Sequence, residues 1–585
     1  MSKLADDYGL DVWIWYPAMD KDYSDPRTVD LAVREWAEVF QKLPRIDAVF
    51  VPGGDPGHTE PKYLLALLER QTESLHRYHP RAQMWVSPQS FNQAWLDEFL
   101  QILRDQRPRW LTGIVFGPQI RISLPELRAA VPAQYPIRLY PDITHSRQCQ
   151  FPVPDWDVAY AITEGRECIN PRPTGEAQIA RRLLPYTIGF LAYSEGCNDD
   201  VNKALWSALA WEPDMPVLEI LRQFSRYFIG NRYTDDFAHG LLALERDWHG
   251  PLIANENVET TLQQFQGMEQ SATPELLRNW RFQQGRYRAY YDAYTRRRLI
   301  YETDLESRAM DALRAAPATG ALPALDQATA LLIRADTVRV ARDWRQRVFD
   351  LAGALFDSIG MQLSVQKYHA IAVDRGANLD TIDYPLNDRA WLLKRFATIR
   401  RLSSEADRLH ALDTIVNWTN PGPGGFYDDL GNLTRQPHLV RGPGFAQDPA
   451  FLQSALVGFE EWTVADEPDE KPPGALRMSW IDHAESLNDA PLRLHYTGLD
   501  PRAHYRLRVV YAGDSLRRKI RLEAGDGIVV HPFLQKPVPI RPLEFEIPPA
   551  ATAKGELELR WYRPPGLGGN GRGCQVSEVW LIKQG

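Results

Sequence analysis

The alternation of short β-rich segments with amphipathic helical segments between residues 10 and 200 constrains the fold more than any other feature of the sequence. Such alternation is typical of βαβ units around a parallel sheet. The helical segments, such as 30–43 and 61–78, repeat apolar residues at three and four positions and so predict a covered sheet face. Six segments are predicted as strands: 11–17, 47–54, 83–89, 113–119, 137–144 and 188–196. A seventh segment, 157–165, is either a further strand or a segment that leaves the sheet between two strands.

Two regions with other patterns follow. Long helical segments such as 274–312 have no fixed repeat and predict a packed helical bundle. The segment 417–432 is too rich in Gly and Pro for regular structure and could reach the barrel rim. After it, apolar and polar residues alternate, as in 557–562. This alternation predicts a β-sandwich that packs on the helices. The expected fold is a multidomain α/β, α and β protein, with a TIM-type (β/α) barrel at 1–235, an all-helical domain at 236–415 and an accessory or carbohydrate-binding-like β-sandwich at 416–585.

Charge and composition exclude several classes of function. The net charge is -9, and no dense basic run accompanies the aromatic residues, so nucleic acid is not an expected partner. No stretch of 18 apolar residues and no leader-like N-terminal segment is present, so we expect no membrane association and, as written, a cytoplasmic protein. A full-length relative could be periplasmic or secreted. The four cysteines lack zinc-site spacing, and no dinucleotide fingerprint occurs, so neither metal nor cofactor is expected.

Polar residues follow the predicted strands, where active sites of parallel barrels lie. The segment VPGGDPGHTEP at 51–61 carries Asp55, His58 and Glu60 among glycines that allow a tight turn and a close ligand approach. The alternative is a turn in which Asp55 caps the next helix. At the last predicted strand, Glu195 lies at the terminus, and Asp199 or Asp200 is expected to cap the following helix.

Cleavage of a glycosidic bond needs a proton donor and a second carboxylate, and this rim supplies several candidates. Aromatic faces can stack on sugar rings beside polar groups that bind hydroxyls. The expected catalytic residues are Asp55, Glu195, Glu60 and Asp142. The expected carbohydrate-binding residues are His58, Trp15, Tyr16, Gln89, His145, Tyr193, Asn198 and Asp199. A glycine-rich segment at 566–574 lacks both the βαβ context and the Lys-Ser/Thr of a phosphate-binding loop.

The succession YGLDVWIWYP and AVFVPGGDPGH resembles the third and fourth barrel strands of β-N-acetylhexosaminidases, in which the fourth ends in Gly-Gly-Asp-Glu. Asp55 matches the Asp of that motif, whereas Pro56 stands where the family has its general acid. The run at 194–230 and the helices after it resemble α-glucuronidases, with Trp211, Pro213 and Asp214 in a similar turn. The resemblance implies that the first two barrel strands are missing. We then expect either an incomplete barrel whose opening is covered by another segment or by a second copy in a homo-oligomer, or a chain derived by truncation of a longer ancestor or gene.

The sequence therefore predicts a glycoside hydrolase that acts on an oligosaccharide or glycan through paired carboxylates. The alternative is a non-catalytic carbohydrate-binding protein built on a degenerate barrel, which Pro56 favours. The sugar, its anomer and the stereochemical outcome are left open by the sequence.

Overall fold

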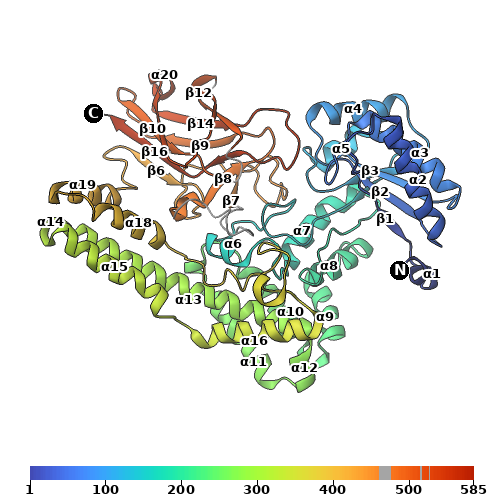
Figure 1. The fold of residues 1–585 in the computed structure, drawn as a ribbon, viewed down its shortest axis with the longest axis horizontal. Helices are drawn as coiled ribbons and strands as arrows, with labels where there is room; N and C mark the ends of the chain where they lie inside the picture. The colour runs from blue at the N-terminus through green and yellow to red at the C-terminus, as the bar shows by residue number, and fades with distance from the viewer. Residues whose placement is uncertain (460–475, 514–516, 526, 585) are drawn as a thin grey trace.

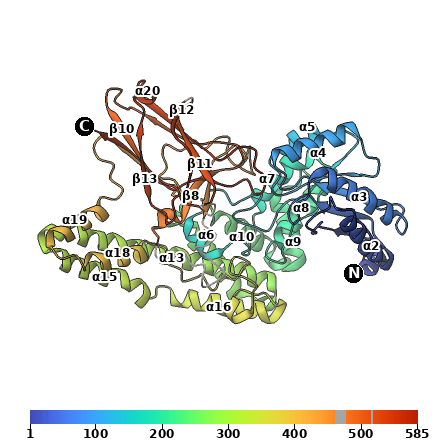
Figure 2. The same ribbon diagram turned by 45° about the horizontal axis from the view of Figure 1, so that its top comes forward.

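The computed structural model describes residues 1–459, 476–513, 517–525 and 527–584. Figure 1 shows three parts: a parallel-sheet unit in blue, a helical region in green and yellow, and orange to red antiparallel sheets. The turned view in Figure 2 keeps the helices along one side of both other parts. The predicted fold class is thus confirmed in its order of α/β, α and β regions. In the described part of the chain, no helix combines the length and the apolar character needed to cross a bilayer.

The parallel-sheet unit contains five strands in the order β1-β2-β3-β4-β5. The strands are β1 (Trp13–Trp15), β2 (Ala48–Pro52), β3 (Gln83–Ser87), β4 (Gly113–Phe116) and β5 (Ile137–Leu139). The helices that accompany them are α1 (Ser2–Asp7), α2 (Pro26–Lys42), α3 (Pro61–His76), α4 (Gln93–Asp105), α5 (Leu124–Ala130), α7 (Pro173–Leu183) and α8 (Asp200–Trp211). Five of the six predicted strands are therefore confirmed.

The sixth predicted strand is an extended segment that continues the sheet without forming a regular strand. Ile188 N donates to Ile137 O at 2.9 Å, and Leu191 N donates to Leu139 O at 2.7 Å. Two isolated parallel bridges, Leu139 to Phe190 and Asp142 to Tyr193, fix the register. The segment 157–165 is not a further strand: its residues Val158–Glu164 form helix α6, between two strand positions. Asp157 begins this helix by accepting a hydrogen bond from Ala159 N at 2.9 Å.

The two faces of the parallel sheet have separate cores. Its outer face packs on the helices through residues such as Val49 and Ile114, within the largest cluster of the unit. Its inner face holds Phe50 and Trp85, and the Arg138 guanidinium lies 4.8 Å from the Trp13 ring. That contact joins β5 to β1 across the concave face and shows that the sheet is strongly curved.

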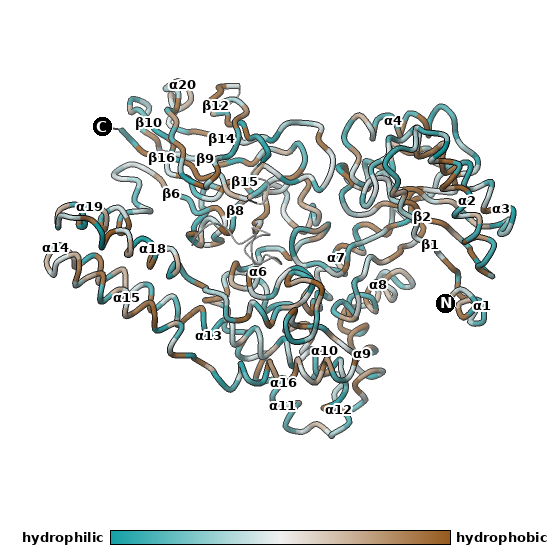
Figure 3. The backbone as a smooth tube through the Cα atoms, in the orientation of Figure 1, coloured by the Kyte–Doolittle hydropathy of each residue, from teal (hydrophilic) through white to brown (hydrophobic). Residues whose placement is uncertain are grey.

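The curved sheet is open. Within residues 1–235, all of which are described, no ring of eight strands closes, and β1 has β2 as its single strand partner. Figure 3 shows hydrophobic stretches of backbone in this unit around the labels β1 and β2. The N-terminal region is therefore an open, curved parallel sheet of five strands that alternate with helices. The expected cover of the open edge by a second copy stays a prediction.

The helical region packs around α13 (Trp280–Arg314), a helix of 35 residues. Its first half is buried on nearly every side and joins the cluster that also contains Tyr160 and Phe459 from outside the region. The remaining helices are α9 (Val217–Phe228), α10 (Thr234–Arg246), α11 (Asn257–Ser271), α12 (Pro274–Arg278), α14 (Ala316–Thr319), α15 (Ala321–Thr337), α16 (Arg342–Ile359), α17 (Val365–Tyr368), α18 (Arg389–Ile399) and α19 (Glu405–Val416). This region lies against both of the other parts of the molecule.

The C-terminal region, called the sandwich below, has two four-stranded antiparallel sheets, β13-β10-β16-β6 and β12-β11-β14-β9, and a three-stranded sheet, β15-β8-β7. Alternate residues of β10, such as Leu507 and Val509, are buried in the common core, as predicted. The strands are β6 (Phe426–Asp429), β7 (Leu456–Phe459), β8 (Asp482–Ser486), β9 (Leu492–Thr497), β10 (His504–Val510), β11 (Lys519–Ala524), β12 (Ile528–Gln535), β13 (Pro542–Ile547), β14 (Glu556–Tyr562), β15 (Cys574–Val576) and β16 (Glu578–Gln584). Helix α20 (Pro549–Thr552) is a single turn before β14.

One prediction for this region is wrong. Residues 426–429 form strand β6 within the sandwich instead of reaching the rim of the parallel sheet. The Tyr427 hydroxyl donates to Glu578 Oε1 at 2.7 Å, and β6 pairs with β16. None of the Gly and Pro residues of the segment lies within 426–429, so they do not prevent regular structure there.

The glycine-rich segment 566–573, called the glycine loop, makes the contact with the rim. Gln93 N donates to Gly566 O at 3.0 Å, and Arg121 Nη1 donates to Leu567 O at 2.7 Å. A Cβ on Gly568 would lie 2.4 Å from Ser90 O, so this close backbone approach requires glycine. The loop therefore joins the sandwich to the loops after β3 and β4.

Candidate active site

The loop after β2 places Asp55 at the surface. Its carboxylate accepts a hydrogen bond from the Gln119 amide, which comes from the loop after β4 and also accepts from the Ser90 hydroxyl. The neighbouring glycines serve close backbone packing: a Cβ on Gly53 would lie 2.5 Å from Ser87 O. The glycines of this loop thus bring it against the loop after β3, and Asp55 is left exposed beside Gln119.

The alternative role of Asp55 as a helix cap is wrong. The residue at the N-cap of α3 is Glu60, whose side chain makes no capping hydrogen bond. Glu60 instead forms an ion pair with Lys62 at 2.8 Å. His58 is exposed, and its ring lies 4.5 Å from the Trp95 ring, centroid to centroid. In the part of the chain that the structure describes, Glu60 thus has a cationic partner, whereas the Asp55 carboxylate forms no ion pair.

The end of β5 carries a buried chain of charged groups. The Asp142 carboxylate is 2.8 Å from His145 Nδ1, and His145 Nε2 is 3.0 Å from Glu167 Oε1. Burial by itself would raise the pKa of Asp142, but the charge and hydrogen bonds of His145 outweigh it and lower that pKa. Burial opposes the charged imidazole as well, and the two carboxylates nevertheless raise the pKa of His145. The arrangement stabilises a protonated histidine between two carboxylates.

Glu195 lies at the exposed end of this chain of charges. Its carboxylate accepts from the Tyr193 hydroxyl and is 3.3 Å from Arg375 Nη1. The same Arg375 nitrogen contacts Glu167. Burial would raise the pKa of Glu167, but hydrogen bonds from His145 and Arg375 lower it. An arginine of the helical region therefore joins the two glutamates.

A second buried group supports the backbone around Glu195. The Asp199 carboxylate accepts from the Thr144 and Ser194 hydroxyls and lies 2.9 Å from Lys203 Nζ. Burial raises the pKa of Asp199. Thr144 Oγ1 in turn accepts from Glu195 N at 3.0 Å. Asp199 occupies the N-cap of α8, as expected, but its side chain makes these contacts instead of a capping bond.

The remaining predicted residues lie at different depths. Asn198 is buried, and its amide donates to Glu167 O at 3.3 Å. Trp15 is 47% exposed at the end of β1, where its ring is available to a ligand. Tyr16 packs in the outer core with its ring 3.8 Å from that of Trp36, so its placement does not favour ligand contact. Gln89 is buried beside the loop after β2.

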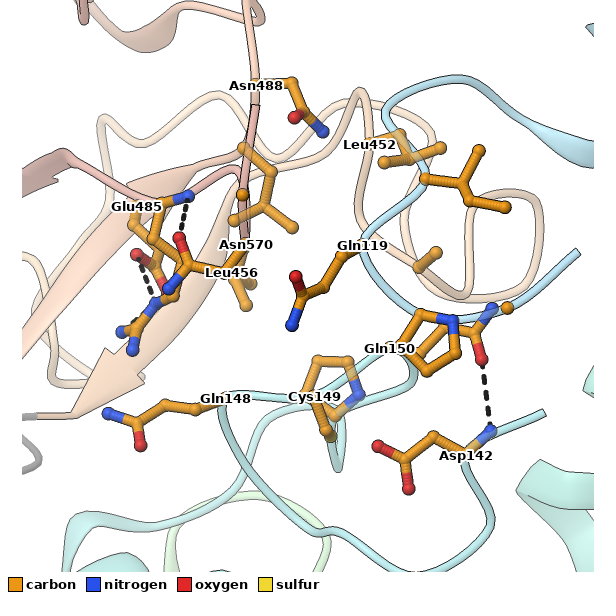
Figure 4. A pocket seen from close by; sticks show the side chains of 18 of the residues that line it. Gln119, Asp142, Gln148, Cys149, Gln150, Leu452, Leu456, Glu485, Asn488 and Asn570 are labelled. Atoms are coloured by element: carbon orange, nitrogen blue, oxygen red, sulfur yellow. Dashed lines mark hydrogen bonds and ion pairs between the residues drawn. The ribbon is translucent and has the colours of Figure 1, made fainter. Parts of the chain in front are cut away.

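A cavity of about 100 Å³ lies between this rim and the sandwich. Figure 4 shows Gln119, Gln150 and Asp142 on the parallel-sheet side and Leu456, Asn488 and Asn570 on the sandwich side. Gln119 connects the cavity to Asp55, and Asp142 connects it to His145. The cavity therefore adjoins both groups of predicted site residues.

The structure also brings together three side chains of metal-ligand type. Single ligand atoms of His145, Glu167 and Glu195 lie within 4.8 Å of one another. Asp142 holds His145 Nδ1, which leaves Nε2 facing the two glutamates, as in many histidine metal ligands. Arg375, however, already places a cationic group on both carboxylates. We therefore interpret the cluster as a protein-internal charge network.

The chain was compared with known proteins. No family model matches it, and no curated protein matches it. Among solved structures it is similar to a novel family GH115 4-O-methyl-α-glucuronidase with specificity for decorated arabinogalactans. That match covers 100% of this chain and 72% of the other, with a TM-score of 0.38 and 9% sequence identity.

Three residues of the site were not predicted from the sequence. Glu167 follows helix α6 and no strand, and Arg375 belongs to the helical region. Gln119 is the last residue of a predicted strand, but many other polar residues also lie at strand ends. For Gln119 the position at a strand end was an available indication. For Glu167 and Arg375 no local pattern distinguishes them, because their role arises from contacts between distant segments.

Proposed function

We propose that this chain is a glycoside hydrolase in which Glu195 and Asp55 are the two carboxylates that contact the glycosidic bond. The observation that carries the proposal is the environment of Glu195. Glu195 is an exposed carboxylate at the end of a parallel sheet. Tyr193 and Arg375 orient it, and it lies close to buried charged side chains. Such a rim is where enzymes of this architecture hold their reacting groups.

The choice of Asp55 as the second carboxylate follows from the state of the other candidates. Asp142 is buried against His145, and Glu60 is paired with Lys62. Asp55 is exposed, and among the described residues its carboxylate is hydrogen-bonded by the neutral amide of Gln119. A carboxylate that must take up or release a proton, or attack a sugar carbon, has to be accessible to the substrate.

Each surrounding residue has a role in this proposal. Glu167 stays ionised because its partners lower its pKa, and with His145 and Arg375 it fixes the local charge. The Tyr193 hydroxyl orients the Glu195 carboxylate by donating to it. Trp15 offers an exposed aromatic face for a sugar ring. Glu195 is proposed to exchange a proton with the leaving oxygen or with water.

The test is hydrolysis of a panel of nitrophenyl glycosides, including hexosaminides, galactosides and glucuronides. Glu195→Gln and Asp55→Asn should each lower kcat/KM by about 10²–10⁴-fold, the usual contribution of a general acid or base. Glu259→Gln is a matched control, because Glu259 is also partly exposed and lies 2.6 Å from an arginine, Arg297. The control should keep full activity. Full activity in both amide variants would remove this site from consideration.

A second candidate function is carbohydrate binding without catalysis. Two observations favour it: Arg375 contacts both Glu167 and Glu195, and Pro56 stands where hexosaminidases have their general acid. A glycan-binding array run beside the hydrolysis panel separates the two functions. Binding of a glycan without turnover of any glycoside would favour this second candidate.

A further inference from the structure

The cavity between the parallel-sheet unit and the sandwich has walls from segments far apart in the chain. Gln119, Asp142 and Gln150 come from the loops after β4 and β5. Leu456, Asn488 and Asn570 come from the sandwich, and Asn570 lies in the glycine loop. Figure 4 shows these side chains facing one another across the open space. The cavity therefore exists only while the two units are in contact.

Several hydrogen bonds and an ion pair hold the two units together, and these interactions give the cavity a fixed shape. Arg121 bridges to the sandwich, with one guanidinium nitrogen on Leu567 O and the other on Asp489. Its side chain is almost completely buried. Gly569 N also donates to Ser90 O at 3.2 Å. A loop held at several backbone positions can present Asn570 in one place, as a binding site requires.

The lining has the chemistry of a site for a neutral, hydroxyl-rich molecule. Five amide side chains line it: Gln119, Gln148, Gln150, Asn488 and Asn570. Amides both donate and accept hydrogen bonds, which suits hydroxyl groups that do the same. Leucines of the sandwich, such as Leu452 and Leu456, add apolar surface for the C–H faces of a ring.

The charges that line the cavity balance one another. Two carboxylates, Asp142 and Glu485, stand against two arginines, Arg166 and Arg572. Arg572 Nε donates to Glu485 Oε1 at 3.0 Å; burial would raise the pKa of Glu485, but Arg572 and its other partners lower it to about 2. A balanced lining favours an uncharged ligand over an anion or a cation. The volume corresponds to roughly seven to ten water positions, which is the scale of one small ring.

We propose that this cavity is a binding site for one neutral sugar unit, and that the sandwich supplies part of the wall through Asn570. The choice of a sugar as the ligand rests on the proposed function. The sandwich is then part of the recognition surface, beyond its structural support of the helical region. Because Gln119 contacts Asp55, a sugar held here lies near that proposed reacting carboxylate. On the other side, Asp142 contacts His145, which belongs to the cluster that includes Glu195.

The test uses the whole chain and the methyl glycosides of glucose, galactose, mannose and xylose at millimolar concentration. Binding is detected by saturation-transfer NMR and measured by titration. Asn570→Ala removes one amide and should weaken binding about fivefold. Its matched control is Asn432→Ala. Asn570 Oδ1 accepts from the N–H two residues on at 3.1 Å, and Asn432 Oδ1 does the same at 3.0 Å away from the cavity.

A second pair of variants fills the cavity. Ala450 lines it, whereas Ala446, in the same segment, is exposed and does not. Ala450→Trp should abolish binding, and Ala446→Trp should leave it unchanged, with thermal unfolding curves recorded for both. The proposal is overturned if no glycoside binds the wild type, or if Asn570→Ala and Ala450→Trp bind as tightly as the wild type.

The same titration separates this proposal from the proposed function. Glu195 does not line the cavity, so Glu195→Gln should keep methyl glycoside binding. Retained binding in Glu195→Gln, together with unchanged hydrolysis by that variant and by Asp55→Asn, overturns the catalytic proposal and supports the sugar site. Lost hydrolysis in those variants, with no glycoside bound in the cavity, supports catalysis and overturns the sugar site.

Discussion

The two halves of the strand-end rim are held in place by different kinds of interaction. In the half formed by the loops after β2, β3 and β4, glycine backbones pack closely and the side chains of Asp55 and His58 remain exposed. In the half formed after β5 and by residues 188–199, buried charged side chains such as Asp142 and His145 hold the structure. Substitutions should therefore act on stability through side-chain charges in one half and through backbone volume in the other.

The largest effect on stability is expected at Glu167, whose carboxylate contacts both His145 and Arg375. Glu167→Ala leaves a buried histidine without one of its two carboxylates and should cost about 3 kcal/mol of unfolding free energy, at the low end for a broken buried pair. The low end applies because the Arg375 side chain is 38% exposed. Urea unfolding measures the loss.

Glu167→Gln is the control for shape, because its amide oxygen can still accept from His145 and Arg375. It should cost clearly less than Glu167→Ala. A loss below about 1 kcal/mol in the alanine variant would show that the charged half is not held by this network.

The next effect is expected at Gly568 in the glycine loop. A Cβ there would lie 2.4 Å from Ser90 O and 2.7 Å from Asn92 N, and both are backbone atoms. Gly568→Ala should therefore cost about 1–3 kcal/mol, as overpacking usually does. Gly267→Ala is the matched control, because a Cβ at Gly267 meets nothing within 4 Å. Equal unfolding midpoints for the two variants would contradict the close approach.

A smaller, pH-dependent effect is expected from the Asp142–His145 pair. Because the pKa of His145 is raised, its contribution is complete below about pH 6.5 and is lost as the pH rises through its folded value. The lowered pKa of Asp142 gives a contribution that is lost as the pH falls below about 4. The stability advantage of the wild type over His145→Gln should thus be larger at pH 5.5 than at pH 9. A larger advantage at pH 9 would reverse the assigned direction.

The smallest effect on stability is expected in the exposed half of the rim. Asp55→Asn keeps a hydrogen-bond acceptor for Gln119, and His58→Ala removes one exposed ring. Each should change the unfolding free energy by about 0.5 kcal/mol or less. If Asp55→Asn destabilised the chain as much as Glu167→Ala, the contrast between the two halves would fail.

The sequence predicted the parts of the fold that depend on local patterns. Five parallel strands, the helical region and the alternating strand β10 follow from periodicity. Residues 188–196 also have a strand pattern, but they pair with β5 on one side at the edge of an open sheet, which leaves an extended segment. Strand β6 was missed because Gly and Pro residues next to it dominated the local composition.

The candidate site was predicted in part. Strand-end position correctly indicated that Asp142, His145 and Glu195 lie close together, because the ends of parallel strands meet at one edge. It could not indicate Arg375, which lies 180 positions from Glu195 in another region. Nor could it indicate that the glycine loop packs against Ser90, because that contact depends on how two folded units meet.

The glycine loop also fixes when the cavity can exist during synthesis of the chain. The bond from Arg121 to Leu567 spans 446 residues, and at about 5–20 residues per second the ribosome needs about 20–90 s to make that stretch. Throughout this interval the parallel-sheet unit can be folded and its Asp55 exposed to solvent, with the cavity wall around Asn570 still unmade. The cavity, and with it the proposed sugar site, is therefore completed only at the end of synthesis, well after the first strands can pair.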